Sequence, residues 1–316
     1  MKTIKKFKAL LFIVLSILLI SGQALAKKTK LSINLQKGSK FKIEVVTTGE
    51  TIMDMMGQEM ITSTNSNMGF AFEVINIDDD KNYIIQVVYD HIVNKTGNGM
   101  VDMEYDSNNP DKDKNSISAK IFDAIIGGHF IIKLNNKGQV IEVENTEDLE
   151  KKIEELVKNI DDPMMGGQMA GLKQAYSSDA LKANMEEIFN LLPKKSVKKG
   201  SSWEQTSKGE QTMPVKTVNT YKLTEIKDTE VILSSTGIIS SQKGSNIMTT
   251  EVADMEFNIS GNQEGQIKID LSTGLIIESK VEKFSEGDMT ISMDQLPEPM
   301  TVPMSIKGTT IIRRYK

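Results

Sequence analysis

From about residue 27 onward, most of the chain alternates apolar and polar residues with a period of two. This pattern is typical of β-strands that bury one face. Early examples are the runs 41–45, 70–77 and 83–89, and a hairpin pattern covers 130–143. After Ser201 the pattern continues in closely spaced runs near 213–226, 230–240, 246–259, 265–271, 275–284, 288–293 and 300–313. Because short turns separate these runs, and a parallel pair needs a long crossover, we predict consecutive antiparallel strands.

Three segments have the helical period instead. A short one follows the capping residue Ser116, and two longer ones cover 147–160 and 179–192, where Pro193 stops the helix. The apolar positions of the two longer segments superimpose with a constant shift of 32 residues, so each carries one apolar stripe. Because such a stripe must be buried, we predict a helical pair that covers the concave face of a sheet.

Some segments recur in the same order in the two parts of the chain. The pairs are 37–41 with 199–203, 72–78 with 221–227, and 130–143 with 267–278. Two related β halves would explain this repetition, and chance similarity of β-type composition is the alternative. We predict a mainly β (α+β) fold, with antiparallel meanders from two related halves forming one curved sheet or two packed sheets, covered by the inserted helical pair. The expected regions are a signal peptide over 1–26, a first β half over 27–145, a helical insert over 146–195 and a second β half over 196–316.

The N-terminus has the three parts of a secretory signal. Four lysines precede an apolar run from Ala9 to Ile20, and Ala24 and Ala26 place small residues before Lys27. The apolar run of about 12 residues is too short to cross a membrane, which takes about 20. With no cysteine in the chain, a lipid anchor at the cleavage point is excluded. We therefore expect an exported protein, periplasmic or extracellular, that is soluble and has no transmembrane anchor after cleavage.

Composition narrows the possible partners further. Without cysteine the chain has no disulfide, no thiolate metal site and no cysteine nucleophile. Beyond residue 26 it holds 34 basic and 43 acidic side chains, and its largest basic cluster is the lysines at 194–195 and 198–199. This balance argues against nucleic acid as a partner.

Two clusters have features of metal sites. Methionines gather at 53–60 and 164–169, and thioethers bind Cu(I), although methionine also fills irregular apolar space. The segment 111–115 spaces oxygen ligands as a calcium loop does, but Ser116 and Phe122 stand where that loop needs Gly and Glu. We therefore predict no cofactor and keep methionine-based Cu(I) binding as a minor alternative.

We identify no catalytic motif in the sequence. The two histidines, His91 and His129, cannot be paired with a nucleophile, and no serine occupies a Gly-x-Ser-x-Gly elbow. Paired carboxylates for sugar hydrolysis stay open, because a sequence does not show their separation. We predict that the protein is not an enzyme.

Five short motifs carry a resemblance to a known family. They are KGSKF at 37–41, MDMMGQEM at 53–60, MEYDS at 103–107, GHFIIKLNNKGQVIEV at 128–143 and KGSSW at 199–203. In this order they resemble an uncharacterised family of exported proteins found chiefly in Bacteroidota, over nearly all of the chain after the signal peptide. That family has no established activity, so the resemblance implies no catalytic residues. The predicted architecture is also similar to the half-barrel lipoprotein carriers of the periplasm.

Two functional hypotheses follow from these patterns. The first is a non-enzymatic binding module of the cell envelope that holds a lipid or another apolar small molecule between sheet and helices. The second is a structural or protein-interaction module, whose partner would be an envelope protein. For the first hypothesis, the expected cleft-lining residues are Met164, Met165, Met169, Met185, Ile188, Phe189 and Leu192.

Overall fold

The computed structural model describes residues 28–55, 57–99, 102–109, 116–158, 175–209, 215–241, 246–249, 253–293 and 298–316. The predicted signal peptide and the methionines of 164–169 lie outside these ranges. Within them, the helices are α2 (Ile117–Ile125), α3 (Glu147–Lys158) and α5 (Ser178–Phe189). The strands are β1 (Lys40–Met55), β2 (Gln58–Ile77), β3 (Tyr83–Gly97), β4 (Asp102–Asp106), β5 (His129–Leu134), β6 (Val140–Glu144), β7 (Ser202–Gly209), β8 (Val215–Ile226), β9 (Glu230–Ser241), β10 (Ile247–Thr249), β11 (Asp254–Asp270), β12 (Ile276–Ser292) and β13 (Met300–Tyr315).

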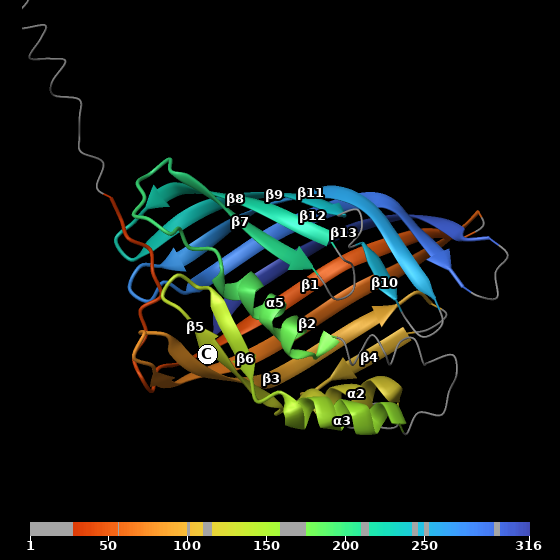
Figure 1. The fold of residues 1–316 in the computed structure, drawn as a ribbon, viewed down its shortest axis with the longest axis horizontal. Helices are drawn as coiled ribbons and strands as arrows, with labels where there is room; N and C mark the ends of the chain where they lie inside the picture. Colours follow the sequence, from red (N-terminus) through yellow and green to blue (C-terminus); the bar gives the residue numbers. More distant parts are fainter. Residues whose placement is uncertain are drawn as a thin grey trace, which may run out of the picture.

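The described strands form one antiparallel sheet in the order β6-β5-β3-β2-β1-β13-β12-β11-β9-β8-β7, with β4 paired to β3 and β10 to β11. The sheet is open and strongly curved, and α5 lies inside the curve (Figure 1). The predicted antiparallel, mainly β fold is therefore confirmed. Of the two predicted arrangements, the structure has the single curved sheet.

Alternation of side chains explains why these segments are strands. In β3, Tyr83, Ile85, Val87 and Tyr89 are buried, whereas the residues between them are half-buried. Successive side chains of a strand point to opposite faces, so one set enters the core and the other faces out. The main core lies between α5 and the concave face, also takes in residues of α2 and α3, and includes Phe72, which is buried.

The helices occupy two different places. The side chain of Ser177 caps α5 by accepting a hydrogen bond from the backbone N–H of Ala180 at 3.4 Å, and the helix then lies between β6 and β7. In contrast, α3 packs mainly against α2, which contacts β4. Figure 1 shows α2 and α3 together at one side of the sheet. The predicted helical cover is therefore α5, while α3 buries its stripe against α2 instead of beside α5.

The C-terminal end of α5 is fixed to the strand that follows it. The indole N–H of Trp203 donates to the carbonyl oxygen of Leu191 at 2.9 Å, and Nε2 of Gln205 donates to that of Leu192 at 3.0 Å. Carbonyl groups at a helix end need such external donors. The bonds hold α5 over the concave face at a defined position.

The segment 28–39 crosses one end of the sheet before β1 begins (Figure 1). Its backbone pairs with Val197, and Ile33 and Asn34 donate N–H groups to the carbonyl oxygens of Asn136 and Thr273, each at 2.9 Å. Leu31, Ile33 and Leu35 are buried. The segment therefore closes this end of the core. None of the helices in the described ranges has the length and apolar content that a membrane crossing requires.

Candidate ligand-binding site

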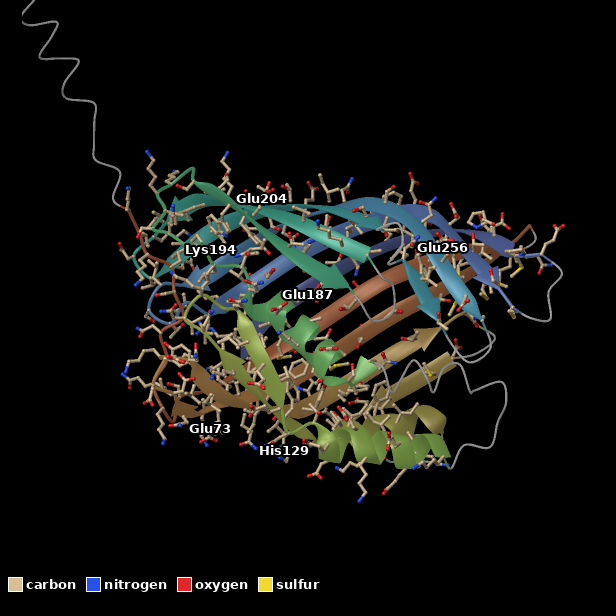
Figure 2. All side chains as sticks on the ribbon, in the orientation of Figure 1. Glu73, His129, Glu187, Lys194, Glu204 and Glu256 are labelled. Carbon is tan, nitrogen blue, oxygen red and sulfur yellow. The ribbon has the colours of Figure 1, made fainter. Side chains whose placement is uncertain are left out.

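A cavity of about 320 Å³ lies between α5 and the concave face of the second part of the sheet. One wall is the side of α5 that carries Ala183, Glu187 and Asn190, and β7, β8, β9, β11, β12 and β13 form the floor. Figure 2 shows Glu187 on this helix, inside the curve of the sheet. Sites for small molecules typically have volumes of about 300–1,000 Å³, so this cavity is large enough for one ligand.

A row of polar and small residues crosses the floor of the cavity. Each member of the row pairs directly with the next member on the neighbouring strand. The row runs from β7 to β3 through Gln205, Asn219, Gly237, Gln263, Lys283, Gly308, Gly49, Thr64 and Thr96. Directly paired residues share one face of a sheet. Because Asn219, Gln263 and Lys283 line the cavity, the whole row faces the concave side.

Gly237 allows two polar side chains of this row to meet. Nε2 of Gln263 donates to Oδ1 of Asn219 at 2.7 Å, although the strand β9 lies between their own strands. A Cβ atom at Gly237 would lie 2.6 Å from that Asn219 oxygen and 2.7 Å from Cγ of Gln263. The position therefore needs a residue without a side chain, and the cavity floor keeps an amide pair at this point.

Among the described residues that line the cavity, Glu186, Glu187 and Lys283 carry charge. Burial raises the pKa of Glu186, and the charge of Lys182 opposes this. Burial also raises the pKa of Tyr221 to about 12, with a further contribution from the charge of Glu187. Lys283 is exposed, and within the described part of the chain its ammonium group makes no ion pair or hydrogen bond. The floor therefore presents an unpaired ammonium group.

A second apolar cluster, here called the distal cluster, adjoins the cavity on the concave face. It consists of buried Phe257, Ile259 and Met304, against which Met53, Val215, Met255, Met289 and Ile306 pack. Three of its members, Val215, Ile259 and Ile306, also line the cavity. The cavity is therefore continuous with a methionine-rich surface, and methionine adapts to ligands of varied shape.

Four of the seven residues predicted to line a cleft are buried in the main core. Met185, Ile188, Phe189 and Leu192 are between 1% and 3% exposed and belong to the main core. The ring of Phe189 contacts Phe72 edge-on, with centroids 5.6 Å apart. The part of α5 that lines the cavity is the opposite side of the same helix. Met164, Met165 and Met169 lie outside the described residues.

The sequence contains a signal for the floor of the cavity that the apolar stripes do not reveal. Gln263 is in phase with Ile259 and Ile267 along β11, and Lys283 is in phase with Val281 along β12. A polar side chain at an inward position contradicts simple amphipathic alternation. Such positions are expected at functional sites, because a packed core has no use for them.

The two histidines lie away from this cavity. His129 is exposed at the start of β5, and His91 lies over Gly69, where a Cβ atom would be 2.1 Å from its Nδ1 atom. Nε2 of His91 is 3.7 Å from Oε2 of Glu44, a carboxylate that also accepts hydrogen bonds from Arg313 and Asn67. Burial opposes ionisation of Glu44, but these bonds outweigh it and lower its pKa. His91 is therefore part of a polar network on the convex face.

The described residues bring few possible metal ligands together. They contain no group of three or more His, Cys, Asp or Glu side chains that could hold a metal ion. The segment 111–115, whose oxygen ligands are spaced as in a calcium loop, lies outside the described ranges, and Asp106 before it accepts hydrogen bonds from the backbone and side chain of Asn108. Among the methionines, Met53 pairs directly with Met60 and Met304 on the neighbouring strands.

Comparison with known proteins gives a family but no activity. The model of a family described as "Family of unknown function (DUF6263)" matches residues 80–276. No curated protein matches the sequence.

Comparison with solved structures finds weak similarity. A structure concerned with lipid–protein interactions in lipovitellin aligns with 90% of this chain at 7% identity and a TM-score of 0.46. The aligned part is 26% of the lipovitellin chain, so this chain spans about a quarter of that protein. An outer membrane channel from Pseudomonas putida F1 aligns at 5% identity over 90% of this chain and 97% of its own, with a TM-score of 0.21. A loop-deletion mutant of the outer membrane protein OmpT of Vibrio cholerae aligns at 8% identity over 89% of this chain and 100% of its own, with a TM-score of 0.20.

Proposed function

This chain belongs to the DUF6263 family of unknown function, and we propose that it is a non-enzymatic binding protein for an apolar or amphiphilic small molecule. The ligand occupies the cavity between α5 and the concave face. The observation that carries this proposal is that the cavity has both a polar row on its floor and a direct connection to the distal cluster. Ligand sites typically combine an apolar lining with a few placed polar groups.

The proposal can be tested with a pair of matched substitutions on β13. Thr310 lines the cavity, whereas Thr309 beside it points to the convex face, where it pairs with Thr48 and Glu282. Thr310→Phe should fill part of the cavity and lower the amount of co-purifying ligand severalfold. Thr309→Phe adds the same volume outside and should leave that amount unchanged.

Native mass spectrometry of the protein and of its organic extract measures this amount, and circular dichroism checks that both variants fold. A wild-type protein with no extractable lipid, and with no thermal shift on addition of fatty acids or phospholipids, would contradict the proposal.

The alternative, a structural or protein-interaction module, has an observation of its own. On the convex face Ile238 is 69% exposed, and Phe284 is exposed two strands away in the same register row through Asn262. A partner protein on this surface would be lost on Ile238→Asp, which cross-linking in cells would detect. Binding of a small molecule in the cavity would be unaffected by the same substitution, so the two functions are separable.

The copper alternative predicts a different response from the methionines. Leucine keeps the apolar surface of the distal cluster but removes the sulfur ligands. A combined Met53→Leu, Met60→Leu and Met304→Leu variant should therefore bind an apolar ligand as the wild type does. Tight Cu(I) binding by the wild type that this variant loses would favour copper instead.

We also propose that the chain is exported, with 1–26 removed, and works in the periplasm or outside the cell. The support is the sequence of the signal segment. Mass spectrometry of the N-terminus of the finished protein tests it, because cleavage leaves Lys27 as the first residue.

A further inference from the structure

The cavity floor contains one feature that a purely apolar ligand would not need. Lys283 stands in the middle of the polar row, between Gln263 on β11 and Gly308 on β13. Its neighbour in sequence on the convex face, Lys280, forms an ion pair with Glu282 at 2.7 Å. Lys283 has no such partner within the described residues.

Two glycines of the polar row lie beside Lys283. Gly308 pairs directly with both Lys283 and Gly49, so two adjacent positions of the row carry no side chain. A Cβ atom at Gly308 would lie 3.8 Å from Cε of Lys283, which places the lysine stem over this glycine. Gly308 therefore leaves room for the lysine stem, and Gly49 is the next position of the floor without a side chain.

Apolar surface extends from this point toward the distal cluster. Along β13, Ile306 and Met304 follow Gly308 at successive inward positions, and Met304 is buried among Phe257 and Ile259. Four residues of a strand span about 13 Å. In the opposite direction the cavity ends at Ile267, Ile276 and Ile312, which line it and are buried members of the main core. A ligand with its polar end at Lys283 therefore meets apolar lining on both sides, and the side toward the distal cluster is the one that continues beyond the cavity.

We infer that the ligand is a single-chain anionic amphiphile, with its carboxylate or phosphate on Lys283 and its chain along Ile306 toward Met304 and Met289. This inference rests on the proposed function and specifies its ligand class. The glutamates of α5 lie on the opposite wall, and burial of Glu186 disfavours its charged form. Among the described lining residues, Lys283 is the one cation that can neutralise an anionic head group.

Equilibrium binding below the micelle concentration tests the head group. The probes are palmitate, palmityl alcohol and palmitoyl lysophosphatidate, with inorganic phosphate as the head-group fragment. Lys283→Met removes the charge and keeps most of the stem, and should weaken palmitate binding by about tenfold, the scale of one charge-assisted hydrogen bond, with alcohol binding unchanged. Lys283→Arg should restore binding, and Lys280→Met on the convex face should have no effect. Tighter binding of lysophosphatidate than of palmitate would identify phosphate as the preferred head group, and the reverse would identify carboxylate.

The outcomes separate this inference from the proposed function. If the wild type binds alcohol as tightly as palmitate, and Lys283→Met changes neither, the inference is wrong while the proposed function stands. If none of the long-chain probes binds, the proposed function itself fails. Binding of inorganic phosphate as tight as that of lysophosphatidate would overturn the part of the inference that concerns the chain.

Methionine oxidation tests the direction of the chain. Met53, Met255 and Met289 of the distal cluster are partly buried, and Met55 at the tip of the β1–β2 hairpin is exposed. Bound palmitate should slow peroxide oxidation of the distal-cluster methionines, measured by peptide mass spectrometry, and leave Met55 unchanged. Palmitate that binds with no protection of Met289 or Met53 would overturn the proposed orientation.

Discussion

Asp270 shows how a single turn residue ties distant parts of the chain together. It lies at the end of β11, accepts hydrogen bonds from Ser272 and from the backbone N–H of Thr273, and forms an ion pair with Arg314 at 3.0 Å. Burial opposes its ionisation, but these bonds outweigh burial and lower its pKa to about 2. The carboxylate therefore links the β11–β12 turn to the last strand in its charged form.

This pKa predicts how stability depends on pH. A carboxylate whose pKa is lowered by folding contributes stability above its unfolded pKa, about 3.8, and loses it as the pH falls through about 2. Asp270→Asn should lower the free energy of unfolding at about pH 7 by about 2 kcal/mol and reduce the loss below about pH 4. Urea unfolding at several pH values measures both effects. The control is Asp228→Asn, in the exposed β8–β9 turn, and equal pH profiles for wild type and Asp270→Asn would contradict the argument.

Gly274 and Gly38 show two different reasons why a position requires glycine. Both have a positive φ, +73° and +84°, but a Cβ atom at Gly274 would lie 2.2 Å from the carbonyl oxygen of Ser32, whereas nothing lies within 4 Å of one at Gly38. Alanine in this backbone region costs about 1 kcal/mol at either site. Gly274→Ala should be more destabilising than Gly38→Ala by at least about 1 kcal/mol, because it also displaces the N-terminal segment. Denaturant titration of both variants measures the difference. Equal midpoints would show that the N-terminal segment can move away from a Cβ atom at Gly274 without loss of stability.

At this scale the sequence predicts turn residues better than cavity residues. Gly38 and Gly138 can be recognised from the runs on either side of them. Gly237 cannot, because its role depends on Asn219 and Gln263, which sheet register brings together from two other strands. Register over long sequence separations is set by the whole pattern of strand pairing, which a linear pattern does not contain.

At the scale of elements, α5 was predicted over 179–192 and occupies Ser178–Phe189. Its apolar stripe and its capping region are local, so they can be predicted. The face of α5 that lines the cavity was not predicted, because Glu187 and Asn190 would be ordinary solvated residues on a helix that covers a filled core. The different position of α3 also could not be predicted, since an apolar stripe shows that a helix is buried but not against which element.

The N-terminal segment is an element that periodicity does not reveal, and its energetic role can be tested. Ile33 is buried and donates its own backbone N–H to the β5–β6 turn, while Asn34 donates to the β11–β12 turn. Ile33→Ala should lower the free energy of unfolding by about 3 kcal/mol, the usual cost of such a core truncation. Lys30→Ala, at an exposed position of the same segment, should cost little. A small loss for Ile33→Ala, measured by urea unfolding, would mean that the segment is not part of the core.

For the whole molecule, the two related halves predicted from weak repetition have matching local structure at one pair of repeats. The backbone N–H of Gly38 donates to Val74 at 2.8 Å, and that of Gly200 donates to Leu223 at 2.7 Å. The register of the sheet shifts between Val74 and Asn76, and equally between Leu223 and Glu225. The strand order β1-β2-β3-β5-β6 has its counterpart in β7-β8-β9-β11-β12. From these correspondences we propose that the two halves arose by duplication, with β13 as an additional strand between them.

The contacts between the two proposed halves predict that they unfold together. β13 pairs with β12 along one edge and with β1 along the other, so the sheet is continuous through the junction. The N-terminal segment also bonds to Asn136 in one half and to Thr273 in the other. A chain with no boundary between its hydrogen-bonded units should show a single cooperative transition.

Trp203 offers a selective probe for this prediction, because it is the single tryptophan of the chain and lies at the start of the second half. Its indole is bonded to Leu191, so its fluorescence should report the loss of α5 as well as of β7. The transition followed by Trp203 fluorescence should coincide with that followed by far-ultraviolet circular dichroism, which reports all strands. An early Trp203 transition that leaves much of the strand signal intact would show that the halves are separate folding units, and the cavity between α5 and the second half would then open before the rest of the sheet.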